Sequence, residues 1–167
     1  MKRIMFVCHG NICRSPMAEF ITKYIVSRLD LDEEYVIASS ATSTEELGSP
    51  IYPPAQRELY RRGIPFDRRE ATQLRPSDYA GYDVFALMDD RNMRNVFRIF
   101  PSDPDGKVRK LLSFTGESRD VADPWYSGDF KGAYDDILDG CIALLTALDP
   151  RLTRDSILRA LNDTRNK

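Results

Sequence analysis

Two residues near the N-terminus have the types and the spacing that covalent phosphoryl chemistry requires. Cys8 and Arg14 have five residues between them, including Gly10 and Asn11. A cysteine is a strong nucleophile only as its thiolate, and the planar guanidinium of arginine can bond two oxygens of one phosphate. A loop that begins with the nucleophile and ends with the guanidinium can hold a phosphoester against the attacking sulfur. This chemistry needs no metal, so we expect neither a metal site nor a cofactor.

The elements around this loop should place it where an anion binds. The apolar residues 4–7 predict a buried strand, and apolar side chains at helical spacing after Pro16 predict a helix that accepts proline in its first turn. A loop between a strand and a helix N-terminus collects unpaired main-chain N–H groups and the positive end of the helix dipole. We expect the phosphate to be bound by His9, Gly10, Asn11, Ile12, Cys13, Arg14 and Ser15.

Three residues of the loop have further expected roles. The lack of a side chain at Gly10 lets the main chain approach the anion, and Asn11 tolerates the left-handed conformation that such a loop often needs. Ser15 can donate a hydrogen bond to the sulfur of Cys8, and Ser15 is therefore expected to support the nucleophile.

A second candidate stretch is Asp123-Pro124-Trp125-Tyr126. A carboxylic acid can protonate the leaving oxygen of a phosphoester and then activate the water that hydrolyses the covalent intermediate. Pro124 disfavours a helical conformation at Asp123, and the two aromatic rings can stack on an aryl group in a cleft. Asp120 is the competing acid, but proline and the aromatic residues follow Asp123.

Residues 7–16, VCHGNICRSP, resemble the phosphate-binding loop of the low-molecular-weight protein tyrosine phosphatases. The resemblance extends from residue 3 to about residue 148. It implies that Cys8 is the nucleophile, that Arg14 binds phosphate and that Asp123 is the general acid and base. It also implies a phosphotyrosine-containing protein as substrate and, in bacteria, a tyrosine autokinase as a partner.

The resemblance further implies that residues 40–50 form one wall of the cleft. Ser43 matches a serine that positions the loop asparagine, here Asn11. Several family members have an aromatic residue near the position of Glu45, where this chain has Glu45 and Glu46. Two acids beside a phosphate site should disfavour anionic substrates or select basic flanking residues. Residues 67–74 lack a matching histidine, so we expect a solvated loop without a role in the site.

One redox hypothesis and three alternative functions bear on the cysteines and on the loop. Cys8 and Cys13 could form a reversible disulfide under peroxide. Arsenate reductases of the same fold relay oxidation through further cysteines, but only Cys141 is left, in an apolar helical segment. Phosphoarginine phosphatases usually have threonine where Ile12 stands. A non-catalytic phosphotyrosine-binding module would have lost Cys8 or Asp123.

The order of predicted elements defines the fold class. Strands predicted at residues 4–7, 35–39, 82–88 and 108–112 alternate with helical segments. These segments include a short helix at residues 75–80 and a helix at residues 91–98 that Asp89 and Asp90 should cap. This predicts an α/β fold, a small doubly wound parallel sheet of four strands with helices on both faces. Residues 1–150 should form one phosphatase domain, and residues 151–167 an extension that is a short helix or frayed.

The composition of the chain indicates which partners and which cellular location to expect. The 167 residues include 24 basic and 26 acidic side chains, a net charge of −2, which disfavours binding to nucleic acid or to a membrane surface. No apolar run reaches the ~18 residues of a membrane span, and the chain enters its first strand without room for a signal peptide. Three cysteines make no secretory disulfide framework. We expect a cytoplasmic monomer.

Overall fold

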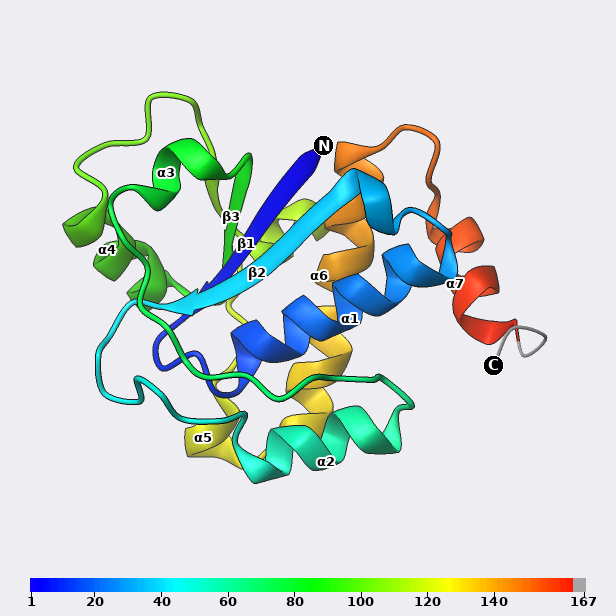
Figure 1. The fold of residues 1–167 in the computed structure, drawn as a ribbon, viewed down its shortest axis with the longest axis horizontal. Helices are drawn as coiled ribbons and strands as arrows, with labels where there is room; N and C mark the ends of the chain where they lie inside the picture. Colours follow the sequence, from blue (N-terminus) through cyan, green and yellow to red (C-terminus); the bar gives the residue numbers. More distant parts are fainter. Residues whose placement is uncertain (164–167) are drawn as a thin grey trace.

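The computed structural model describes residues 1–163 and contains a parallel sheet with strand order β2-β1-β3-β4 (Figure 1). The strands are β1 (Lys2–Cys8), β2 (Tyr35–Ala41), β3 (Val84–Leu87) and β4 (Val108–Lys110). β1 pairs with β2 on one side and with β3 on the other. The parallel four-stranded α/β sheet predicted from the sequence is therefore confirmed.

The helices connect these strands and cover both faces of the sheet. Their bounds are α1 (Arg14–Arg28), α2 (Pro53–Arg61), α3 (Asp78–Gly81), α4 (Asp90–Ile99), α5 (Pro124–Ser127), α6 (Phe130–Leu148) and α7 (Arg154–Asn162), with two 3-10 turns, η1 (Asp32–Glu34) and η2 (Leu111–Thr115). None of the helices within residues 1–163 is long and apolar enough to cross a membrane.

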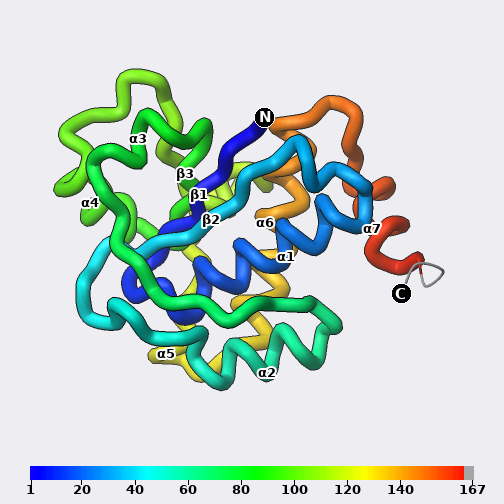
Figure 2. The backbone as a smooth tube through the Cα atoms, viewed as in Figure 1, coloured from blue at the N-terminus to red at the C-terminus, as the bar shows by residue number. Residues whose placement is uncertain are grey.

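Alternate side chains of β1 belong to two separate cores, as the two-residue period of a strand requires. Ile4 and Phe6 are buried in the larger core with side chains of α1 and α6. Met5 and Val7 are buried in a smaller core that includes Val96 of α4. Figures 1 and 2 show α1 and α6 on one side of the sheet and α3 and α4 on the other. The central strand is thus enclosed, and its carboxyl end is fixed by both cores.

Several element boundaries differ from the prediction, and two of the differences have a clear local cause. The strand expected at residues 108–112 ends at Lys110, and Leu111 begins the 3-10 turn η2. The helix expected from residue 75 begins only at Asp78, whose carboxylate accepts a hydrogen bond of 2.8 Å from the Arg75 main-chain N–H. Pro76 disfavours a helical conformation at the residue before it, so a turn precedes the helix.

The chain after residue 150 packs against the domain. Thr153 and Ser156 form a capping box at the start of α7, and Ile157 is completely buried in the larger core. The short helix that the sequence allowed is present. The alternative of a frayed tail also covers residues 164–167, which lie outside the described residues.

Candidate active site

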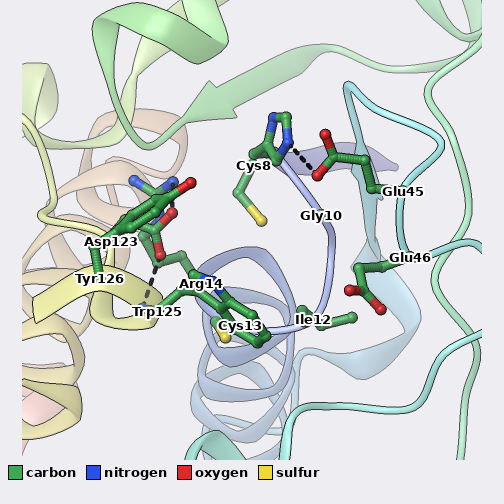
Figure 3. Close-up of a pocket in the computed structure, with 11 residues that line it drawn as sticks. Cys8, Gly10, Ile12, Cys13, Arg14, Glu45, Glu46, Asp123, Trp125 and Tyr126 are labelled. Atoms are coloured by element: carbon green, nitrogen blue, oxygen red, sulfur yellow. Dashed lines mark hydrogen bonds and ion pairs between the residues drawn. The ribbon is translucent and has the colours of Figure 1, made fainter. Parts of the chain in front are cut away.

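A pocket of about 110 Å³ opens where β1 ends and α1 begins (Figure 3). In a parallel α/β sheet, ligands bind at this carboxyl edge of the strands. The loop from Cys8 to Arg14 forms the floor, and two other segments contribute the walls. The residues that line it are Cys8, His9, Gly10, Ile12, Cys13, Arg14, Glu45, Glu46, Asp123, Trp125 and Tyr126.

The main-chain polar groups of the loop are divided between its two sides. Four of its carbonyl oxygens accept hydrogen bonds from outside the loop. The Cys8 carbonyl accepts from Thr42 N at 3.0 Å and the His9 carbonyl from Ser43 N at 3.1 Å. The Asn11 carbonyl accepts from Arg69 Nη2 at 2.6 Å and the Ile12 carbonyl from Tyr52 N at 2.9 Å. By contrast, the main-chain N–H groups of residues 9–13 donate to no acceptor within residues 1–163. Successive unpaired N–H groups beside a helix N-terminus favour an anion. The loop therefore offers its donors to the pocket while its acceptors are occupied elsewhere.

Asn11 fixes the shape of the loop. Its φ of 58° is left-handed, as predicted for this position. Its amide Nδ2 donates to Ser15 Oγ at 2.7 Å and to Ser39 Oγ at 2.9 Å, and its Oδ1 accepts a bond of 3.2 Å from Thr72 N. The side chain is completely buried, so these three bonds satisfy an amide that has no access to water.

The prediction that Ser43 positions Asn11 is wrong. Ser43 Oγ donates to the His9 carbonyl at 2.9 Å instead, and the serine outside the loop that contacts Asn11 is Ser39 of β2. β2 continues to Ala41, beyond the predicted end of the strand, and Ser39 lies opposite Phe6 of β1. The strand register therefore carries Ser39 to the loop, while Ser43 follows the end of the strand and reaches only the first turn of the loop.

The nucleophile candidate lies beside a hydroxyl that can donate to it. Cys8 Sγ is 3.0 Å from Ser15 Oγ, and both residues are buried. Because Ser15 Oγ already accepts a hydrogen bond from Asn11 Nδ2, its own proton is available for the sulfur. The contact therefore places a hydroxyl donor directly beside the candidate nucleophile.

Arg14 is held in place by groups from two distant segments. Its Nη1 donates to Asp89 Oδ2 at 2.7 Å and to the Val121 carbonyl at 2.8 Å, and its Nη2 lies 3.4 Å from Asp123 Oδ2. Burial disfavours the cation, but Cys8, Asp123 and Asp89 outweigh it and raise the pKa of Arg14. Its Nε–H has no partner among the described residues and is left for a phosphate oxygen.

Asp89 has a second role besides orienting Arg14. The sequence predicted it as a helix cap, and the structure confirms this: Asp89 and Asn92 form a capping box at the start of α4. The Asp89 Oδ1 atom accepts from Asn92 N at 2.7 Å, and its Oδ2 accepts from Arg14. One carboxylate therefore couples the start of α4 to Arg14.

Of the two candidate acids, Asp123 lines the pocket and Asp120 does not. Asp123 Oδ1 accepts a hydrogen bond of 3.1 Å from Trp125 N at the start of α5. The Asp120 carboxylate instead accepts from Asp90 N and forms an ion pair of 2.9 Å with Lys110. The geometry thus leaves Asp123 as the carboxylate within reach of a bound phosphoester.

The two walls of the pocket have different character. Asp123, Trp125 and Tyr126 lie on one side of Cys8, and Glu45 and Glu46 lie on the opposite side (Figure 3). The Glu45 carboxylate is 2.9 Å from His9 Nε2. The Trp125 ring is half exposed, and Tyr52, which the sequence did not single out, packs against it with ring centroids 4.8 Å apart. An aryl group would enter between an aromatic wall and an acidic wall.

The expectation of a solvated loop without a role at residues 67–74 is wrong. Arg69 and Thr72 bond to Asn11, and Gln73 forms a parallel bridge with Ala41 at the end of β2. Burial lowers the pKa of Arg69, and its Nη1 has no partner within residues 1–163. The sequence of residues 67–74 is rich in charge, which is typical of a solvated loop. The bridge between Gln73 and Ala41 brings this segment under the phosphate-binding loop, and no local sequence pattern predicts that bridge.

The chain matches the family described as low molecular weight phosphotyrosine protein phosphatase over residues 3–154. It is 36% identical over 146 residues to a low molecular weight protein-tyrosine-phosphatase, PtpA, of Staphylococcus aureus, covering 87% of this chain and 92% of that protein. It is similar to the solved structure of SP-PTP, a low molecular weight protein tyrosine phosphatase from Streptococcus pyogenes (TM-score 0.81, 34% identity, covering 96% and 99% of the two chains). It is also similar to YfkJ from Bacillus subtilis (TM-score 0.86, 31% identity, covering 92% and 98%). With its pocket built on the loop that begins at Cys8, the chain belongs to the low molecular weight phosphotyrosine protein phosphatase family.

Proposed function

We propose that the protein hydrolyses phosphotyrosine in protein substrates through a phosphocysteine intermediate on Cys8. The observation that carries this proposal is the division of the loop's polar groups, with carbonyls bonded outward and the N–H groups of residues 9–13 unpaired around the sulfur. Arg14 and Asp123 complete a site for an anion, a nucleophile and a proton donor. The names of the family and of its relatives support the same substrate.

In the first step the Cys8 thiolate attacks phosphorus in line with the leaving tyrosyl oxygen. The S–P bond forms as the P–O bond breaks, and the Asp123 carboxyl gives its proton to the departing oxygen. The guanidinium of Arg14 and the loop N–H groups bind the three other phosphate oxygens and stabilise their charge in the transition state. Tyrosine leaves neutral, and Asp123 is left as a carboxylate.

In the second step the same carboxylate acts as a base. Asp123 takes a proton from a water molecule that attacks phosphorus, the S–P bond breaks, and inorganic phosphate and the Cys8 thiolate are released. The hydroxyl of Ser15, 3.0 Å from the sulfur, stabilises the departing thiolate. The cycle restores the starting protonation state and needs no metal.

The walls of the pocket favour an aryl phosphate. Trp125 and Tyr126 offer aromatic surface, and the apolar side chain of Ile12 faces the same pocket. An arsenate reductase would need a further accessible thiol, whereas Cys141 is completely buried in α6. These features favour phosphotyrosine over phosphoarginine or arsenate as the substrate.

We also propose that peroxide joins Cys8 and Cys13 in a reversible disulfide. Burial raises the pKa of the Cys13 thiol, and Cys8 and Asp123 add to this, so Cys8 is the sulfur that peroxide oxidises to the sulfenic acid. Cys13 then attacks that sulfur, the S–S bond forms and water leaves. A Cys8–Cys13 cross-linked peptide, with activity recovered by dithiothreitol, is expected. Irreversible inactivation is expected for Cys13→Ser, and an uncross-linked peptide in the oxidised wild type would refute the proposal.

The setting that we propose is a monomer in the cytoplasm. All three cysteines are free thiols, which suits a reducing compartment. A tyrosine autokinase is the proposed partner. Light scattering of the purified protein tests the monomer, and loss of phosphotyrosine from an autophosphorylated kinase tests the partner.

The central experiment is hydrolysis of p-nitrophenyl phosphate and of a phosphotyrosine peptide with excess EDTA. The wild type should be active and Cys8→Ser inactive. Asp123→Ala should be slowed by roughly 10²–10⁴ on the phosphotyrosine peptide and less on p-nitrophenyl phosphate. Phosphoarginine and thioredoxin-coupled arsenate reduction serve as the competing substrates. A wild type that binds vanadate but hydrolyses no phosphoester would overturn the proposal.

A further inference from the structure

A second depression adjoins the catalytic pocket and is lined by arginines of α4. It has a volume of about 470 Å³, and Arg91, Arg94 and Arg98 contribute its charged wall. His9 lines both this depression, here called the α4 groove, and the catalytic pocket. The two hollows therefore meet at the first residue after the nucleophile.

The three arginines lie on one face of the helix, because residues three, four and seven apart in an α-helix are neighbours. All three side chains are exposed, and none has a hydrogen bond or an ion pair within residues 1–163. In contrast, Arg62, Arg119 and Arg151 are each paired with carboxylates. The positive charge of the α4 groove is thus not neutralised by the chain itself.

The other residues that line the α4 groove are also suited to an anion. No aspartate or glutamate is among them, and Asn95 adds a side-chain amide that can donate hydrogen bonds. Thr42 lines the groove too, and its buried hydroxyl has no partner in the described part of the chain. The groove offers hydrogen-bond donors and positive charge without an internal counter-ion.

We propose that the α4 groove binds acidic side chains of the protein substrate next to its phosphotyrosine. This inference rests on the proposed function. Arg91 and Arg98 are separated by seven residues, or about 10 Å along the helix axis, which matches about three residues of an extended peptide at roughly 3.3 Å each. A peptide whose phosphotyrosine enters the pocket can pass His9 and lay two or three side chains along the arginines.

A second charged rim of the pocket gives the bound peptide a direction. Glu45 and Glu46 form that rim, and their charge favours a basic residue. A substrate with acidic residues on one side of phosphotyrosine and a basic residue on the other would match both rims. The site would then read the charge order of the sequence around the phosphotyrosine as well as the phosphate itself.

The test compares phosphotyrosine peptides of equal length that have three aspartates before the phosphotyrosine, three after it, or alanines at all six positions. The variant Arg94→Ala/Arg98→Ala removes two charges from the groove. Arg57→Ala/Arg159→Ala is the matched control, because both residues are exposed, lie on α2 and α7, and change the net charge equally. The readout is the ratio of kcat/KM for each acidic peptide to kcat/KM for the alanine peptide.

We expect one of the acidic peptides to be preferred about tenfold by the wild type and by the control, and the groove variant to lose most of that ratio. High salt should reduce the preference. Equal ratios in wild type and groove variant, or equal losses in groove variant and control, would overturn the proposal. The proposal would also be overturned if the groove variant lost inhibition by inorganic phosphate to the same extent. The arginines would then act on the pocket only through their long-range electrostatic field.

Binding separates this proposal from the proposed function. Fluorescence anisotropy of the labelled peptides with Cys8→Ser, with and without Arg94→Ala/Arg98→Ala, needs no turnover. If the wild type hydrolyses no phosphotyrosine peptide, the proposed function fails. Tighter binding of one acidic peptide that depends on the two arginines would still support the groove, and its absence would refute it.

Discussion

Arg69 donates a hydrogen bond of 2.6 Å to the main-chain carbonyl of Asn11, the loop residue with left-handed backbone. The Asn11 side chain in turn bonds Ser15, which contacts the sulfur of Cys8. A half-buried arginine from a segment without a catalytic motif is therefore joined to the nucleophile through two intervening residues. Arg69 acts as a positioning residue: it fixes the loop and does not touch the reacting atoms.

Replacing Arg69 should loosen the loop without unfolding the protein. Misplacement of a reacting group by about 1 Å can cost 10²-fold in rate, so we expect Arg69→Ala to lower kcat/KM by roughly 10- to 100-fold and to weaken inhibition by vanadate. Arg69→Lys keeps a cationic donor and should recover part of the loss. The adjacent Arg68→Ala is the control, because Arg68 is exposed; equal effects at the two positions would refute the role of Arg69.

The identity of the proton donor predicts a dependence on the leaving group. Asp123→Asn cannot protonate the departing oxygen, so hydrolysis of phenyl phosphate should slow by roughly 10²–10⁴. The p-nitrophenyl ester should slow less, since its leaving anion is more stable. Steady-state kinetics over a series of aryl phosphates measures this slope. Asp120→Asn should leave the slope unchanged, and a steeper slope there would favour Asp120 as the acid.

Asp149 at the end of α6 gives a stability that depends on pH. Hydrogen bonds from Arg151, of 2.7 and 3.0 Å to its side chain, lower the pKa of Asp149 to about 2. The stabilisation is complete above the unfolded value of about 4 and is lost as the pH falls through about 2. Because Arg151 is largely exposed, Asp149→Asn should cost only about 1–2 kcal/mol at pH 7.

Urea unfolding of wild type and Asp149→Asn between pH 7 and pH 2 checks this prediction. The difference in free energy of unfolding should shrink as the pH falls from about 4 to about 2. Asp139→Asn is the matched control, since Asp139 pairs with Arg154 at 3.0 Å where both side chains are half exposed. A constant difference at all pH values would contradict the role of the Asp149 charge.

The buried position of Ile157 predicts that α7 contributes to the stability of the domain. Ile157→Ala removes a completely buried side chain from the larger core and should cost about 2–5 kcal/mol. Arg159→Ala on the exposed face of the same helix should change stability by less than about 0.5 kcal/mol. Urea unfolding measures both, and an unaffected Ile157→Ala would mean that the extension is not part of the folded core.

The predictable part of the site is the part that is contiguous in sequence. The thiol, the guanidinium and the strand–helix junction all lie within residues 4–16, where residue type and spacing alone restrict the chemistry. Ser39 and Arg69 could not be predicted, since their contacts with Asn11 depend on the exact end of β2 and on a bridge to its edge. Choosing Ser43 over Ser39 was an error of strand length, which local sequence determines poorly.

The fold, like the site, could be predicted where the signal is local in the sequence. Alternation of apolar strands and helices predicted the parallel sheet because both faces of β1 must be buried. The late start of α3 and the early end of β4 depended on single turns at Arg75 and Leu111. The family resemblance extended the prediction to Asp123. This residue is far from Cys8 along the chain, but both line the same pocket.

The loop that carries out the chemistry and the residues that surround its mouth come from different parts of the chain. Residues 8–15 contain the proposed nucleophile and the proposed phosphate ligands, whereas the mouth is built from the segments after β2, at the start of α5 and along α4. Of the side chains on those rims, Glu45 bonds to the loop through His9, and Asp123 contacts Arg14. Provided that Asp123 is kept, the surrounding segments can therefore diverge, or be exchanged by design, to retarget the enzyme to a new phosphoprotein without rebuilding its phosphate-binding loop.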